Sequence, residues 1–331
     1  MDVWLRWDAV HYMNIARQGY SGVGRADANF APLYPYLVLY LKPLFGGGEI
    51  VTGLLLSTLM AVAACVIFYR LVWEAFQQDE GLARWSVAAW GIYPTSFFLF
   101  APFTEALFSA LALGCLLALY RRQWLWSGLL AVGAGLARQQ GVLMVVPMLV
   151  FGWQHWCDDP TPHWRRLAGL ALAPLGYLGY LYWRSQQGIP FILESYGQFS
   201  KAAFLDPFSG YITAWVFALS RQNLAALTEV LSITLFLTMT IWMCFRPRFR
   251  ADWALLAYNF ICLALFVSMQ NLAATPIQSS NRYVISLYPA FIGLGALLLG
   301  WPPGRRKEYV LASLVGWMAA ATLYVLWLFV G

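Results

Sequence analysis

The sequence predicts an all-α polytopic membrane protein, a bundle of about ten transmembrane helices with a further helix on the outer membrane surface. Of 331 residues, 61% are hydrophobic and 11% are charged, whereas a soluble domain carries roughly 25% charged residues. The apolar residues also form long blocks that contain no Asp, Glu, Lys or Arg. A water-soluble fold is therefore excluded, and we expect an integral membrane protein.

Apolar blocks of two lengths account for the predicted spans. The longer blocks meet the roughly 17–25 residues that a helix needs to cross about 30 Å of hydrocarbon, and they lie at 50–69, 85–104, 253–281, 283–304 and 309–331. The shorter blocks predict short, tilted or broken spans at 106–120, 123–137, 139–157, 167–183 and 230–245. We expect one membrane domain over 1–331, with an outward loop over 1–49 and a transmembrane bundle over 50–331.

The basic residues predict the orientation of these spans. Under the positive-inside rule, the cytoplasmic ends carry Arg70, Arg84, Arg121, Arg122, Arg165, Arg166, Arg246, Arg248, Arg250, Arg305, Arg306 and Lys307. The ends that face outward are then residues 1–30, the turn near Pro102, the break at Arg138, the segment 184–223 and the loop 270–282. The positive net charge is explained by this topology, so no nucleic-acid partner is expected.

The apolar stretch 33–45 is too short to span, because Lys42-Pro43 and Gly46-Gly47-Gly48 interrupt it. It predicts an outward helix lying in the interface. Residue 1 is then outside with no helix to carry it there. We therefore expect a first membrane helix to precede these residues.

The densest polar cluster lies near the amino end, where Arg6, Asp8, His11 and Tyr12 follow closely on Trp4. If 8–16 is helical, Asp8, His11 and Tyr12 share one face. A carboxylate there can accept a proton from a sugar hydroxyl. The alternative is that Asp8 caps the helix and the tryptophans anchor it in the interface.

Glu105 and Arg138 are charged residues at the ends of apolar blocks. Glu105 follows a proline turn, and a carboxylate at membrane level is a functional candidate; the alternative is a helix cap. Arg138 is followed by Gln139, Gln140 and Gly141, a composition that predicts a broken helix lining a cavity. The alternative for Arg138 is an arginine that snorkels to the headgroups.

Arg282 lies among hydroxyl and amide side chains, just before Tyr283 and a long apolar block. The planar guanidinium suits a phosphate at the membrane surface, although an ordinary headgroup contact is the alternative. Lys201 adds a further outward cation, or is a solvated loop residue. No metal site is indicated, because the histidines share no outward loop; Asp8 and Glu105 with waters would suit a divalent cation, but nothing in the sequence requires one.

Several motifs together resemble the GPI mannosyltransferase family, of the kind that adds the second mannose, and its bacterial relatives. In chain order they are RWDAVHYMNIARQGY, FAPLYPYL, YPTSFFLFAPFTEALF, ARQQGVL and NRYVISLYPAF. They extend from residue 4 to about 291. The first motif is specific, and the later ones gain force from their order.

The resemblance implies an inverting glycosyltransferase of the GT-C class in a bacterial cytoplasmic membrane, with its active site on the extracytoplasmic face. Its donor would be a polyprenyl-phosphate sugar, by resemblance a mannose, and its acceptor a glycolipid, polysaccharide or protein, with membrane lipids around it and no firmly implied cofactor. By resemblance Asp8 is the base, Glu105 is the second acidic position, Arg138 lies in the helix break, and Arg282 with Tyr283 lies near the last outward loop. We expect Arg282, Arg138 and Lys201 to bind the donor phosphate, and His11, Tyr12, Arg6, Gln139, Gln140 and Tyr283 to contact substrate.

Two departures from the family pattern concern this site. Only three residues precede Trp4, where the family has a membrane helix, and Gln139-Gln140 replaces the usual Ser-Asn after the arginine. Two other functions fit the composition: a lipid or small-solute transporter, and a non-catalytic lipid-binding subunit. Matching Gly-interrupted segments in both halves would favour transport, but the second half contains no such segment.

Overall fold

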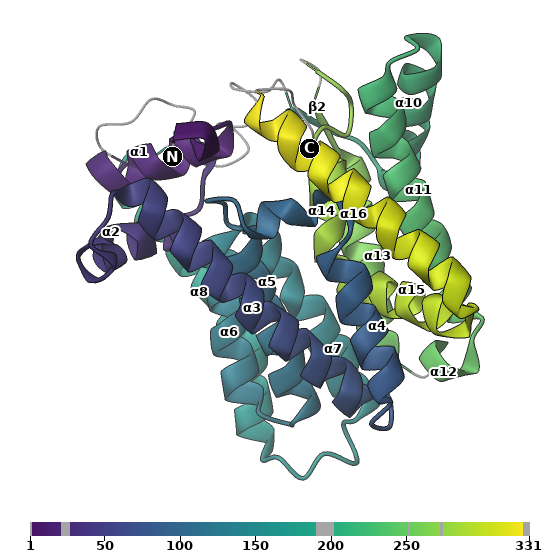
Figure 1. Cartoon of the computed structure of the whole chain (residues 1–331). Helices are drawn as coiled ribbons and strands as arrows, with labels where there is room; N and C mark the ends of the chain where they lie inside the picture. The colour runs from purple at the N-terminus through teal and green to yellow at the C-terminus, as the bar shows by residue number, and fades with distance from the viewer. Residues whose placement is uncertain (1, 21–26, 190–201, 251, 272–273, 327–331) are drawn as a thin grey trace. The chain divides into compact units, whose positions relative to one another are not determined.

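The computed structural model describes residues 2–20, 27–189, 202–250, 252–271 and 274–326, and it is almost entirely helical (Figure 1). The chain divides into two compact units. The first consists of Met1–Gln78 and Phe98–Ser195, and the second of Asp79–Phe97 and Tyr196–Gly331. Each unit is described by itself.

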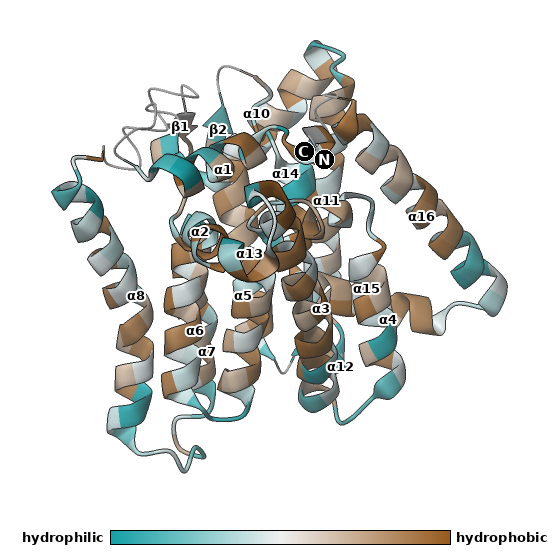
Figure 2. Ribbon diagram, turned by 60° about the vertical axis from the view of Figure 1, so that its left-hand side comes forward, coloured by the Kyte–Doolittle hydropathy of each residue, from teal (hydrophilic) through white to brown (hydrophobic). Residues whose placement is uncertain are grey.

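Long helices side by side form the first unit, with α1 and α2 across one end of them (Figure 2). Its α-helices are α1 (Asp8–Gln18), α2 (Leu33–Phe45), α3 (Glu49–Ala75), α5 (Glu105–Tyr120), α6 (Trp124–Ala137), α7 (Val145–Gln154) and α8 (His163–Gln186). Its 3₁₀ turns are η1 (Asp2–Trp4), η2 (Asp27–Asn29) and η4 (Gln139–Met144). The helix predicted over 33–45 is confirmed as α2, which ends where Gly46 adopts a left-handed conformation.

The charged residues of the first unit separate its two ends. At the end away from α1 and α2, Arg121 donates from Nε to Glu74 at 2.9 Å, and Arg166 donates to the Thr161 carbonyl at 2.8 Å. The expected cytoplasmic arginines of this unit therefore gather at one end. That this end faces the cytoplasm stays a prediction.

The second unit contains α4 packed on α15, and α11 packed on α10, α13 and α15. Its helices are α4 (Glu80–Gly91), α10 (Pro207–Ser220), α11 (Leu224–Cys244), α12 (Pro247–Arg250), α13 (Trp253–Ser268), α14 (Ser280–Tyr283), η5 (Val284–Ser286), α15 (Tyr288–Gly300) and α16 (Pro303–Val325). Two short strands, β1 (Ala202–Phe204) and β2 (Met269–Asn271), pair antiparallel. The turn η3 (Pro94–Leu99) crosses the boundary between the units.

Within the described ranges, three helices are long and apolar enough to cross a membrane: α3, α11 and α16. The pair formed by Ser280–Ser286 and α15 passes the same test together, but it bends by 80°. The apolar helices α5, α6 and α13 are shorter, and they match blocks at 106–120 and 123–137 and the start of 253–281. These helices support a membrane protein.

Three long apolar blocks are not the single helices that the sequence predicts, and one of them is the block 283–304, which bends by 80° before α15. The block 85–104 breaks after Gly91, because Pro94 disfavours helical backbone before it and begins a 3₁₀ turn. The block 253–281 is helical only to Ser268, where the chain enters β2. Conversely, α10 was not predicted within the outward segment 184–223.

Two glycines let α6 and α8 approach closely. A Cβ on Gly128 would lie 2.4 Å from the Gly169 carbonyl oxygen, and a Cβ on Gly169 would lie 2.3 Å from the Trp124 carbonyl oxygen. Both contacts are with backbone, which cannot rotate away. The two backbones therefore pack at a distance that no larger residue allows.

Gly169→Ala is expected to force α6 and α8 apart and to lower the free energy of unfolding by about 1–3 kcal/mol, the usual cost of overpacking. Thermal unfolding of the detergent-solubilised protein measures the change. Gly179→Ala on the same helix is the control, because a Cβ there meets nothing within 4 Å. Equal melting temperatures for the two variants would refute the close-packing argument.

Candidate functional site

Residues 8–16 are helical, as the shared face of Asp8, His11 and Tyr12 requires, and they lie within α1. Trp7 precedes it with a positive φ of 49°, and Asp8 occupies its first turn. Its buried face includes Ala9, Tyr12 and Met13, so Tyr12 points into the unit. The Asp8 side chain lies at the half-buried edge of this helix.

The predicted break at Arg138 is also confirmed. Helix α6 ends at Ala137, Arg138 has extended backbone (φ −149°, ψ 141°), and the 3₁₀ turn η4 follows. The turn folds back on α6 so tightly that a Cβ on Gly141 would lie 2.2 Å from the Ala134 carbonyl carbon. Glycine at 141 is therefore what allows the backbone to leave the helix here.

A polar network joins three elements at this end of the first unit. The Arg138 guanidinium forms an ion pair with Glu105, the first residue of α5, and donates to the Thr104 hydroxyl at 3.3 Å. The Tyr12 hydroxyl lies 3.1 Å from the same Thr104 hydroxyl. Predicted site residues from α1, α5 and the α6 break are thus brought together.

Asp8 precedes Tyr12 by four residues on α1, so the two side chains share one face of the helix. Burial raises the pKa of the Tyr12 hydroxyl well above its ordinary value, and the Asp8 carboxylate raises it further, while Arg138 lowers it. Tyr12 therefore stays protonated at physiological pH. Its neutral hydroxyl can therefore donate or accept a hydrogen bond among the charged side chains of Asp8, Glu105 and Arg138.

His11 contacts an acidic residue that sequence reasoning missed. Its Nδ1 pairs with the buried carboxylate of Asp27 in η2, and its ring stacks on Phe30 with centroids 4.7 Å apart. The carboxylate fixes the orientation of the imidazole. The sequence shows Asp27 in the same outward segment as His11. It does not show that the two side chains meet, because residues sixteen apart share no helix face.

The turn η2 is held by groups from two other helices. Gln139 donates from Nε2 to the Asn29 carbonyl at 3.1 Å, and Arg184 donates to the Ala28 carbonyl at 2.6 Å. Arg184 is 2% exposed and also was not predicted as a site residue. Its position near the end of an apolar helix resembles that of any juxtamembrane arginine, so the sequence held no signal for its burial.

Arg6 and Gln140 are the remaining predicted residues of the first unit. Arg6 is half-buried before α1 and donates to the Leu5 carbonyl at 3.2 Å. Gln140 is half-buried in η4. In sequence, Arg6 lies two residues before Asp8, and Gln140 lies two residues after Arg138.

Arg282 and Tyr283 lie in α14 of the second unit. Arg282 is buried, and its guanidinium carbon lies 5.3 Å from the centroid of the Tyr283 ring. Lys201 lies outside the described residues. Within the described part of the chain, no three His, Cys, Asp or Glu side chains gather as metal ligands.

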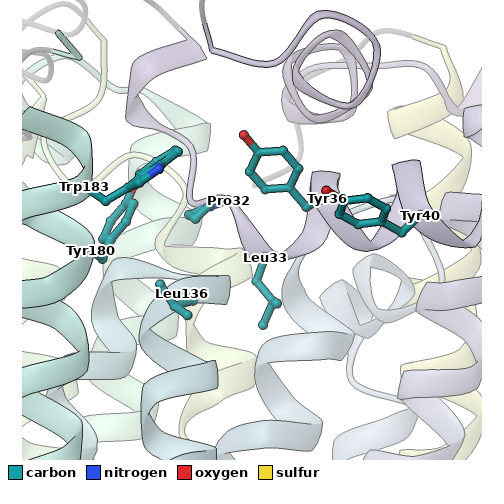
Figure 3. Close-up of a pocket in the computed structure, with 7 residues that line it drawn as sticks. All are labelled: Pro32, Leu33, Tyr36, Tyr40, Leu136, Tyr180 and Trp183. Atoms are coloured by element: carbon teal, nitrogen blue, oxygen red, sulfur yellow. The ribbon is translucent and has the colours of Figure 1, made fainter. Parts of the chain in front are cut away.

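A pocket of about 470 Å³ lies between α2 and α8 (Figure 3). Tyr36 and Tyr40 of α2 form one wall, and Tyr180 and Trp183 of α8 form the opposite one. The lining is completed by Pro32, Leu33 and Leu136. The pocket is thus lined by aromatic and aliphatic side chains, and Leu136 lies two residues before Arg138.

No protein-family model matches the chain. Over 133 residues the chain is 26% identical to GPI mannosyltransferase 2 of Schizosaccharomyces pombe, a match that covers 38% of this chain and 28% of that protein. ArnT from Cupriavidus metallidurans, in a crystal structure bound to undecaprenyl phosphate, matches 97% of this chain with a TM-score of 0.60 and 16% sequence identity. The chain has the fold of ArnT. The apo crystal structure of ArnT agrees, with a TM-score of 0.57 over 94% of the chain.

The ArnT fold confirms the predicted fold class, an all-α polytopic membrane protein. The chain spans less than two thirds of the proteins it matches, since it covers 62% of ArnT in the lipid-bound structure and 57% in the apo structure. The ArnT match therefore establishes the fold of the chain and not its activity.

Removing either partner of the Glu105–Arg138 pair is expected to leave a buried charge and to destabilise the protein by about 3–5 kcal/mol. Glu105→Ala and Arg138→Ala combined should cost less than the sum of the single losses, because the second substitution removes the stranded charge. A double-mutant cycle of thermal unfolding measures this coupling. Strict additivity would show that the pair contributes no mutual stabilisation.

Proposed function

We propose that the chain is an inverting glycosyltransferase that moves a sugar from a polyprenyl-phosphate donor to an acceptor hydroxyl on the outer face of a bacterial cytoplasmic membrane. The observation that carries the proposal is the half-buried Asp8 beside the Tyr12–Thr104–Glu105–Arg138 network, in a chain with the ArnT fold. The undecaprenyl phosphate bound to ArnT supports the donor class. The identity to a GPI mannosyltransferase favours mannose.

Asp8 is the proposed general base. Its carboxylate takes the proton of the acceptor hydroxyl as the oxygen attacks the anomeric carbon. The bond from that carbon to the phosphate oxygen breaks on the opposite face, and its electron pair leaves with the polyprenyl phosphate. A single displacement with one base inverts the configuration and needs no enzyme nucleophile.

The leaving phosphate gains negative charge, which cations stabilise. Arg138, Arg282 and Lys201 are the proposed groups. A guanidinium carries its N–H donors in one plane, so the bonds from Arg138 to Glu105 and Thr104 fix the plane in which it would meet a phosphate. Glu105 is proposed to act as the second acid of the site through this pairing.

The other predicted residues are proposed to contact the sugar or the acceptor. His11, oriented by Asp27, and Tyr12 offer hydrogen bonds on the same helix as Asp8, while Arg6, Gln139 and Gln140 lie close to the network in sequence. Tyr283 is proposed to act beside Arg282. The aromatic pocket is proposed to receive the first isoprene units of the donor, because its lining is apolar.

Asp8→Asn is expected to reduce transfer roughly 10²–10⁴-fold, the usual contribution of a general base, with little change in donor binding. The assay incubates purified protein with radiolabelled polyprenyl-phosphate mannose and membrane extract, and equilibrium binding of undecaprenyl phosphate is measured in parallel. Asp206→Asn makes the same chemical change at an exposed helix cap, where Asn caps equally well. Wild-type transfer by Asp8→Asn would remove Asp8 as the base.

Leu136→Trp is expected to fill the aromatic pocket and to weaken undecaprenyl phosphate binding about tenfold, which corresponds to about 1.4 kcal/mol. Steric exclusion is the cause, since a lipid tail gains little by moving from bilayer to an apolar pocket. Leu129→Trp is the control, because Leu129 lies on the same helix and is 50% exposed. Unchanged binding by Leu136→Trp would place the isoprenoid chain elsewhere.

A further inference from the structure

Glu229 is a buried carboxylate that neither the sequence reasoning nor the proposed mechanism uses. It lies in the first two turns of α11, a helix long and apolar enough to cross a membrane, and it is 3% exposed. An ionisable group in such a helix is costly to retain and marks a functional role. Its contacts indicate what that role is.

Both oxygens of Glu229 hold the loop that precedes α14. Oε2 accepts a hydrogen bond from the Thr275 hydroxyl at 2.6 Å, and Oε1 accepts one from the backbone N–H of Ser279 at 2.9 Å. Ser279 has a left-handed backbone with φ of 71°, which a non-glycine residue rarely adopts. The carboxylate therefore stabilises an unfavourable conformation.

Ser279 connects Glu229 directly to Arg282. The Ser279 carbonyl accepts hydrogen bonds from the backbone N–H groups of Arg282 and Tyr283, each at 3.0 Å. These bonds close the first turn of α14. The direction in which the Arg282 side chain leaves the backbone thus depends on the conformation that Glu229 holds.

Two neighbours of Glu229 on α11 restrain the same loop. Ser232 donates to the Asn281 side-chain oxygen at 2.6 Å, and Asn281 donates to the Thr228 hydroxyl at 3.2 Å. Thr95 donates to the Asn281 carbonyl at 2.6 Å. The residue before Arg282 is therefore fixed on both its side chain and its backbone.

We propose that Glu229 is a positioning residue, which acts through Ser279 to hold Arg282 in the orientation that binds the donor phosphate. This inference rests on the proposed phosphate-binding role of Arg282. A carboxylate that only stabilised the fold would affect phosphate binding equally whether or not Arg282 was present. The two roles therefore differ in their coupling to Arg282.

The test is a double-mutant cycle on equilibrium binding of undecaprenyl phosphate to the purified full chain. Glu229→Leu is of similar size but has no hydrogen-bond acceptor, so both loop contacts are lost. We expect binding to weaken about tenfold, the effect of one misplaced charge-assisted contact, and less than about twofold in an Arg282→Ala background. Equal weakening in both backgrounds, or none in either, overturns the inference.

Two further variants separate positioning from loss of fold. Thr275→Val removes only the bond to Oε2, and we expect a smaller loss of binding, about threefold, that again disappears with Arg282→Ala. Thr240→Val is the stability control: it lies on α11 and removes a buried hydroxyl bonded to Phe236 and Asn259, far along the helix from the loop. It is expected to lower the melting temperature without changing binding; a comparable binding loss overturns the positioning role.

The same data separate this inference from the proposed function. If Arg282→Ala binds undecaprenyl phosphate as well as the wild type does, the phosphate role of Arg282 fails, and the Glu229 inference falls with it. If Arg282→Ala weakens binding but Glu229→Leu does not, Arg282 keeps its role and only the positioning by Glu229 is refuted.

Discussion

The structure depends on one constraint: a charge removed from water needs a partner. Moving a carboxylate or a guanidinium into a low-dielectric interior costs several kcal/mol even after relaxation, and a chain with this composition has little polar surface to share. Glu105 meets this constraint through Arg138, and Glu229 through a hydroxyl and a backbone N–H. Arg184 does so in part through a carbonyl and a phenol.

These partners are available mainly where helices begin or end, because a helix interior has already paired its own backbone groups. Arg138 follows the last residue of α6, Glu105 is the first of α5, and Ser279 precedes α14. The backbone at Arg138 is extended and that at Ser279 is left-handed, as irregular backbone at membrane depth requires protein around it. In this chain, the buried charges are therefore paired at the positions where helices begin, end or break.

Sequence reasoning succeeded where the determinant is local. The extent of α2 and the break at Arg138 follow from apolar runs and from the Lys, Pro, Gly and Gln residues that interrupt them. It failed where the partner is distant in sequence. Asp27 pairs with His11 only after the chain folds back, and Arg184 donates to the carbonyl of Ala28. Glu229 was overlooked because a search for charge-free blocks begins after each charge and treats the charge itself as a boundary.

The two ends of the first unit use similar residues for different purposes. At the end away from α1, Asp159 is almost fully buried, and although burial raises its pKa, hydrogen bonds from Thr161 and Trp124 and the charge of Arg122 lower it to a net value below the ordinary one. Such a carboxylate stays ionised and holds a loop, and it is a poor proton acceptor. At the opposite end Asp8 is only half-buried, beside a neutral phenol. A carboxylate that must meet a substrate hydroxyl needs this accessibility, which is why the chemistry is assigned to the end that contains Asp8.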